Sequence, residues 1–133
     1  MRELAAAAAA ALIVAHSSWA VAAEDNLIGK WTGLVLETGT NGAVDVWDVT
    51  LTVADLDHAT IAYEGLDCGG TLAFLRTVGN VREYRETLTY GREKCIDGGT
   101  VGFSLNRGKL LWYWSGEGTS EPTALDVGVL SRQ

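Results

Sequence analysis

The sequence predicts an all-β domain that is preceded by a secretory signal peptide and closed by one disulfide. Helical periodicity is absent after residue 24, short runs of alternating apolar and polar residues recur along the chain, and turn-forming residues separate them. We expect eight strands, at 28–37, 43–54, 58–64, 70–77, 81–90, 99–105, 109–115 and 122–131. Sequential antiparallel strands of this number form an up-and-down barrel or a β-sandwich. We favour the barrel because closure removes exposed edges.

The first 23 residues have the three parts of a signal peptide. Arg2 supplies the charged start, an apolar run extends from Leu4 to Ala15, and small residues end the segment at Ala23, with Ala20 as the alternative cleavage point. The apolar run is shorter than the ~20 residues that span a bilayer, and no cysteine follows it for a lipid anchor. We therefore expect a periplasmic or secreted protein in which 24–133 form a single domain.

Charge and cysteine content narrow the function classes. The formal net charge is −7, which argues against nucleic acid or an anionic membrane surface as a partner. Cys68 and Cys95 are the two cysteines of the chain, and an even pair in an exported protein predicts a disulfide. In a meander the connections that hold these two cysteines lie at the same end of the barrel, as disulfide geometry requires.

The hairpin around Arg107-Gly108 is the most specific local prediction. A two-residue turn there pairs 105 with 110, 103 with 112 and 101 with 114, and all six side chains are apolar and share one face. We expect the last strand to begin at Pro122 and to continue this inner face with Leu125, Val127 and Val129. The large aromatic side chains are expected to fill the barrel; they are Trp31, Trp47, Phe103, Trp112 and Trp114.

The segment Gly29-Lys30-Trp31-Thr32-Gly33 resembles the Gly-x-Trp signature of the calycin barrels, the lipocalins and avidins. Those families place a basic residue near the chain end over the signature tryptophan, and Arg132 is the counterpart here, so the resemblance implies a structural signature of Gly29, Trp31 and Arg132. Gly33 stands where avidins have a polar ligand-contacting residue, so biotin binding is not implied. The glycine and cysteine pattern from Cys68 onward also resembles an extracytoplasmic module of exported bacterial proteins, which implies no activity.

Glu86 is the first candidate for chemistry. It shares a strand face with aromatic and aliphatic residues, so we expect it to point into the barrel, where a carboxylate must be paired, hydrogen-bonded or protonated. Candidate partners are Arg76, a tyrosine hydroxyl or backbone amides. The residue opposite Glu86 is Leu72 if the preceding turn has three residues and Ala73 if it has two, and the sequence leaves both registers open.

The loops at the disulfide end are the second candidate, because loops on a rigid scaffold commonly carry binding. With Glu86, the candidate binding residues are Asp67, Arg92, Lys94, Asp97, Glu117 and Glu121. We predict no catalytic residue, since the mature chain has one histidine, His58, no Gly-x-Ser-x-Gly elbow, and two oxidised cysteines. We predict no metal and no cofactor, because Asp55 and Asp57 beside His58 are typical of a turn.

These observations lead to the expectation of an exported, non-catalytic interaction module. It would bind a protein partner through the loops at the disulfide end, in the manner of exported bacterial barrels that inhibit lysozymes or proteases. A small-ligand-binding calycin-like barrel is the alternative, and an enzyme that pairs Glu86 with an acidic loop residue is a third. A filled barrel favours the first, whereas an open apolar cavity of several hundred Å³ would favour the second.

Overall fold

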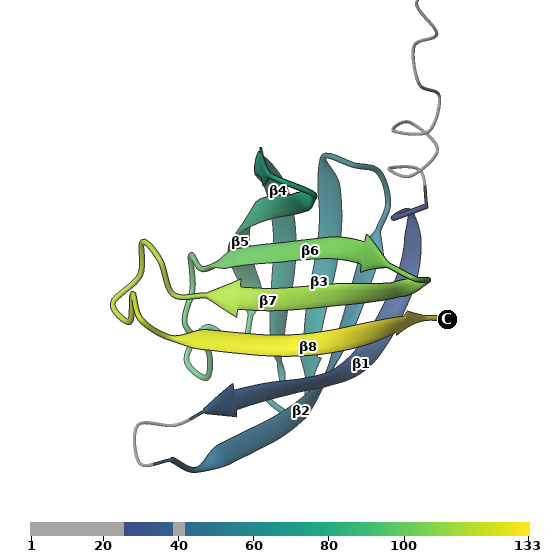
Figure 1. Cartoon of the computed structure of the whole chain (residues 1–133). Coiled ribbons are helices and arrows are strands. Elements are labelled where there is room, and N and C mark those ends of the chain that lie inside the picture. The colour runs from purple at the N-terminus through teal and green to yellow at the C-terminus, as the bar shows by residue number, and fades with distance from the viewer. Residues whose placement is uncertain (1–25, 39–41) are drawn as a thin grey trace, which may run out of the picture.

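The computed structural model of the chain describes residues 26–38 and 42–133, which form a closed antiparallel barrel (Figure 1). Its eight strands are β1 Gly29–Thr38, β2 Val44–Val53, β3 His58–Glu64, β4 Cys68–Val78, β5 Val81–Tyr90, β6 Thr100–Asn106, β7 Lys109–Ser115 and β8 Leu125–Arg132. Each strand pairs with the next, and β8 pairs with β1. The predicted barrel is confirmed, whereas the predicted signal peptide, residues 1–23, lies outside the described residues.

No helix in the described part of the chain is long and apolar enough to cross a membrane. The core is the inner face of the barrel, where the largest fully buried side chains include Trp31, Tyr84 and Phe103. The rings of Tyr84 and Phe103 stack with centroids 4.8 Å apart. The inner face therefore packs as a solid core along most of the barrel, in agreement with the expected filling by large aromatic residues.

The hairpin between β6 and β7 has the predicted register. Residue pairs 105–110, 103–112 and 101–114 face each other across the strands. Arg107 and Gly108 both have positive φ, 51° and 79°, which is the geometry of the type I′ turn that matches the twist of a hairpin. The turn residues and the apolar alternation agree at this point, and that agreement determines the register.

The prediction for β8 is wrong in two respects. Pro122 does not open the strand but lies in the preceding turn, where Gly116 N–H donates to Ala124 O at 2.9 Å. Leu125, Val127 and Val129 point outward and are about half exposed, whereas the inward positions are Asp126, Gly128 and Leu130. Gly128 is the inward residue between Asp126 and Leu130, and a Cβ there would lie 2.7 Å from Leu34 O of β1, so only glycine fits this inward position.

The β4–β5 hairpin combines the two registers that the sequence left open. Its turn has two residues, since Val78 pairs with Val81, yet Leu72 lies opposite Glu86 as the three-residue turn would require. A bulge at Leu75, between Phe74 and Arg76, supplies the extra residue. The bulge changes which face each later residue of β4 occupies and moves Arg76 to the outside of the barrel.

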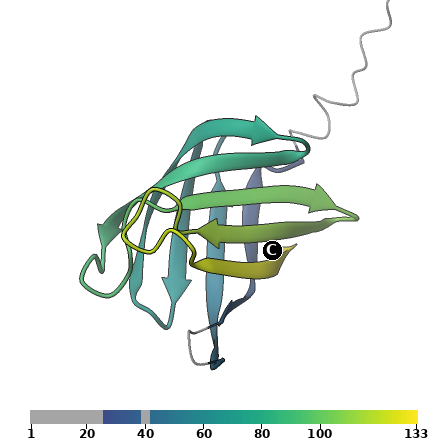
Figure 2. The ribbon, with the colours of Figure 1, turned by 60° about the vertical axis from the view of Figure 1, so that its left-hand side comes forward.

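The two ends of the barrel differ in their connections (Figures 1 and 2). One end carries the turns 54–57, 79–80 and 107–108 and the C-terminus. The other end carries the longer loops 91–99 and 116–124 and the β3–β4 turn. We call these the closed end and the disulfide end.

Candidate binding site at the disulfide end

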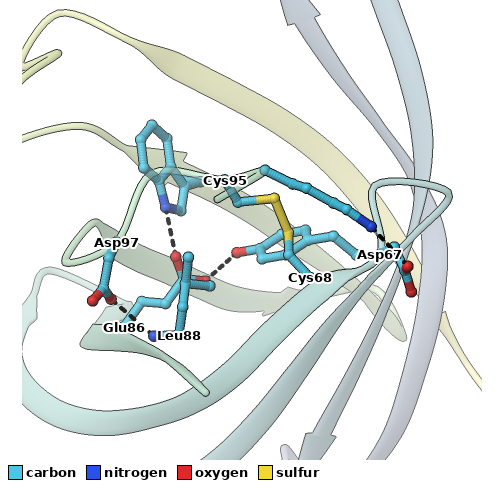
Figure 3. The surroundings of a disulfide bond; sticks show 9 residues. Asp67, Cys68, Glu86, Leu88, Cys95 and Asp97 are labelled. Carbon is cyan, nitrogen blue, oxygen red and sulfur yellow. Dashed lines mark hydrogen bonds and ion pairs between the residues drawn. A yellow bond between two sulfur atoms is a disulfide. The ribbon is translucent and has the colours of Figure 1, made fainter. Parts of the chain in front are cut away.

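The predicted disulfide between Cys68 and Cys95 is present (Figure 3). Cys68 is the first residue of β4 and Cys95 lies in the 91–99 loop, with Cα atoms 6.4 Å apart. Gly91 permits this approach, because its φ is +66° and a Cβ at that position would lie 2.6 Å from the Cβ of Cys68. The bond therefore fastens one of the two long loops of the disulfide end to the barrel wall.

Glu86 points into the barrel and is 1 % exposed, as predicted. Each carboxylate oxygen accepts one hydrogen bond from an aromatic side chain: Tyr63 Oη donates to Oε2, and Trp114 Nε1 donates to Oε1 at 3.1 Å (Figure 3). Burial raises the pKa of Glu86, and the two aromatic donors oppose that rise. The partners are thus a tyrosine hydroxyl, which was expected, and an indole, which was not.

Arg76 is not a partner of Glu86. The bulge at Leu75 places its guanidinium outside the barrel, where Nε contacts Glu83 Oε1 at 2.9 Å. Tyr113 Oη donates to the other oxygen of Glu83 at 2.8 Å. Burial favours a higher pKa for Glu83, but the bonds from Tyr113 and Arg76 outweigh it and lower the pKa. Glu83 is therefore a paired structural carboxylate of the outer wall.

The predicted loop charges mostly pair with one another. Lys94 Nζ lies 2.9 Å from Asp67 Oδ2, and Arg92 Nη2 lies 2.6 Å from Asp97 Oδ2. The backbone N–H of Leu88 donates to Asp97 Oδ1 at 2.8 Å and lowers the pKa of Asp97, with Arg92 acting in the same direction (Figure 3). These four residues brace the loops around the disulfide.

Glu117 and Glu121 lie in the 116–124 loop. Glu117 Oε2 is 3.8 Å from Arg76 Nη2, and Glu121 lines a cavity in the barrel mouth. The loop is braced internally, since Thr119 Oγ1 donates to Gly116 O at 2.5 Å. The main chain of Glu121 passes so close to Gly116 that a Cβ at 116 would collide with it. The loop therefore holds Glu121 at the rim in a defined position.

A cavity of about 170 Å³ opens among the loops of the disulfide end. Three of its walls are aromatic, namely Trp47, Tyr63 and Trp114, and four carboxylate residues line it, namely Glu37, Glu86, Glu121 and Asp126. Lys94 is the sole cation among the described lining residues, and its ammonium is bonded to Asp67. This cavity, called the mouth cavity below, is thus small, aromatic and acidic.

Asp126 is the functional candidate that sequence reasoning missed. Its side chain is 9 % exposed, and its direct cross-strand partner on β1 is another carboxylate, Glu37. Burial raises the pKa of Asp126 to about 7, and the charges of Glu37 and Glu86 act in the same direction. An outward orientation was expected for this residue, because its apolar neighbours in β8 were assigned to the inner face.

The residues of the Gly-x-Trp signature meet at the closed end. The Arg132 guanidinium lies over the Trp31 ring, 4.3 Å from its centroid, and Nη1 donates to Ile28 O at 2.7 Å. A Cβ at Gly29 would lie 2.6 Å from Arg132 Nη1, so the glycine makes room for the guanidinium. A second arginine, Arg82, packs over Phe74 at the same end. The closed end is sealed by stacked arginines.

A second and larger hollow, about 850 Å³, lies on the outside of the barrel over β1, β8 and β7, and its walls include Leu34, Leu111 and Val127. Inside the barrel, the volume of the mouth cavity is below the several hundred Å³ expected of a ligand-binding calyx.

No protein-family model matches the sequence, and no curated protein matches it.

Proposed function

We propose that this protein is an exported, non-catalytic binding module that recognises a basic partner through its disulfide end. The observation that carries the proposal is the mouth cavity, in which four carboxylate residues face a single lysine that is already paired with Asp67. Low-dielectric walls strengthen the field of such a group of charges. The net charge of −7 steers cationic partners toward the protein in the same sense.

A non-catalytic role is supported by how the reactive groups are used. Both cysteines are in the disulfide. His58 lies at the closed end, where its Nδ1 is 2.9 Å from Asp55 Oδ1, and Asp55 also accepts the backbone N–H of Asp57 at 2.9 Å. Both oxygens of Glu86 accept bonds from aromatic side chains. This arrangement favours a structural role for Glu86 over acid–base chemistry.

Export and a calycin-type barrel belong to the same proposal. The disulfide suits an oxidising compartment, and the leader has the order of regions that signal peptidases recognise. The strand count and the stacking of Arg132 on Trp31 are the features shared with calycins. Sequencing the N-terminus of the protein after expression in a bacterium tests export, and an intact residue 1 contradicts it.

The functional test compares two ends of one barrel. Purified wild type, a Glu117→Lys/Glu121→Lys variant and an Asp57→Lys control are used to capture proteins from an extracytoplasmic fraction, and the captured partner is then titrated against each. Asp57 is exposed at the closed end, so Asp57→Lys changes the charge in the same direction, by half as much as the two-site variant, without touching the mouth. We expect at least tenfold weaker binding for the Glu117/Glu121 variant alone, a loss of about 1.4 kcal/mol or more. Equal binding by all three proteins overturns the proposal.

A further inference from the structure

Two residues that line the mouth cavity each carry a buried polar atom that lacks a partner. Asp126 Oδ1, an acceptor, and Trp47 Nε1, a donor, have no hydrogen-bond partner within the described residues, and both side chains are only 9 % exposed. Buried polar groups of native proteins are nearly always satisfied, so two unsatisfied ones on residues that line one cavity point to a ligand. The other two such atoms in the described residues, in Thr100 and Trp112, do not line the cavity. A ligand that both donates and accepts would satisfy Asp126 and Trp47 together.

The charges around Asp126 define what kind of donor is needed. Glu37 on β1 is its cross-strand partner and Glu86 on β5 adds a second negative charge. From β3 the cavity presents the Tyr63 hydroxyl, which is bonded to Glu86, and the loops contribute Glu121 and the paired Lys94. A neutral donor leaves this excess of negative charge uncompensated, whereas a cation balances it. Aromatic walls further favour a cation through their π faces.

We propose that the mouth cavity binds the ammonium group of a small amine that carries a hydroxyl or carbonyl oxygen, with the ammonium at Asp126 and the oxygen at Trp47. The volume of about 170 Å³ limits the bound part to a few heavy atoms, well below the ~300 Å³ at which drug-sized pockets begin. A free amino alcohol and the N-terminal residue of a peptide share this chemistry. The inference rests on the proposed function, because it takes the disulfide end as the recognition surface.

Binding should depend on pH in a direction set by Asp126. Its pKa of about 7 means that the carboxyl is largely protonated below that pH, and an ammonium group gains from it only once the proton has left. Affinity for an amine probe therefore rises from pH 6 to pH 8 in the wild type. In an Asp126→Asn variant this rise is absent, because the carboxyl that titrates near pH 7 has been removed.

Four probes test the inference: 2-aminoethanol, glycinamide, propylamine and propan-1-ol. The indole N–H signal of Trp47, assigned with Trp47→Phe, is followed by ¹H–¹⁵N NMR. The Trp31 signal is the internal control, because Trp31 Nε1 already donates to Leu27 O at 3.0 Å. We expect 2-aminoethanol or glycinamide to shift the Trp47 signal and to bind about tenfold tighter than propylamine, with no binding of propan-1-ol. The tighter of the two probes identifies the amino alcohol or the peptide terminus as the source.

Variants separate this inference from the proposed function. We expect Asp126→Asn to weaken the amine probes by about tenfold or more, and Asp57→Asn at the closed end to leave them unchanged. Equal affinity for propan-1-ol overturns the cationic assignment, and equal affinity for propylamine overturns the role of Trp47. If no probe moves the Trp47 signal while the Glu117/Glu121 variant still loses its partner, the inference fails and the proposed function stands. If both experiments are negative, both fail.

Discussion

The two ends of this barrel use tryptophan in opposite ways. At the closed end, Trp31 is fully buried, its indole donates to the Leu27 carbonyl, and the guanidinium of Arg132 covers its ring. At the disulfide end, Trp47 and Trp114 line a cavity; one indole N–H has no partner and the other donates to the carboxylate of Glu86. Tryptophan therefore fills the core at the closed end and lines the mouth cavity at the disulfide end.

The two ends also differ in how completely their buried polar atoms are hydrogen-bonded. Polar atoms of the closed end are satisfied by backbone carbonyls of neighbouring segments, as when Tyr84 Oη donates to Leu56 O at 2.8 Å. At the disulfide end, by contrast, Asp126 Oδ1 and Trp47 Nε1 lack a hydrogen-bond partner among the described residues. Such incomplete satisfaction costs stability, and natural proteins tolerate it mainly at functional sites.

Replacing Trp31 by alanine should produce the largest loss of stability. We expect Trp31→Ala to lower the free energy of unfolding by about 3–5 kcal/mol, since it removes a fully buried aromatic side chain. The matched variant Trp47→Ala should cost less, because it also removes an unsatisfied indole N–H that already costs the folded state about 1–3 kcal/mol. Urea denaturation of both variants measures the difference. Equal costs contradict the division between the two ends.

Removing the disulfide should have the next largest effect, and it should act on the loops. Cys68→Ala/Cys95→Ala opens a loop with a sequence separation of 27 residues, for which the chain-entropy estimate is about 3–4 kcal/mol. Thermal and urea unfolding measure the loss, and the stacking of Arg132 on Trp31 should survive it. If mass spectrometry of the full-length wild type produced in a bacterium finds two free thiols, the bond does not form in the cell.

Because Asp126 loses its proton near pH 7, the free energy of unfolding should fall as the pH rises. The folded pKa of about 7 lies above the ordinary value of 3.8, so between those values the folded state holds a proton that the unfolded state has released. Stability contributed by the protonated form is complete below about pH 4, declines toward pH 7, and is lost above it. A shift of this size corresponds to about 4 kcal/mol, and solvent screening at the barrel mouth reduces the expected decline to on the order of 2 kcal/mol. Asp126→Asn should flatten the profile, and an unchanged slope contradicts the assignment.

Turn chemistry and period-two alternation predicted most of this fold. All eight strands were located with only small shifts at their ends, and the β6–β7 hairpin had the predicted register because its turn and its apolar pattern agree. The β4–β5 register could not be predicted, since the bulge at Leu75 depends on tertiary packing and leaves no sequence signal. That bulge also explains why Arg76, one of the three candidate partners of Glu86, does not pair with it.

The site was predicted only in part, and one strand accounts for the main omission. The orientation of Glu86 and the disulfide followed from the sequence, but Asp126 was missed because β8 was assigned to the wrong face. A signal was available: Arg132, expected to cover Trp31, is an even number of residues from Asp126, Gly128 and Leu130. Since side chains alternate along a strand, that expectation was incompatible with inward-facing residues at 125, 127 and 129. The outer face of β8 is apolar as well, so hydrophobicity did not indicate which of its residues point inward.

The outward valines of β8 provide the smallest and most specific test of this correction. Val127 and Val129 are 47 % and 52 % exposed, so Val127→Thr should change the free energy of unfolding by no more than about 0.5 kcal/mol, as is usual for surface positions. An inward valine would lose far more, because a buried hydroxyl needs a partner that the core does not offer. Urea denaturation distinguishes the two orientations, and a loss above about 1.5 kcal/mol would return Val127 to the core and turn Asp126 away from the mouth cavity.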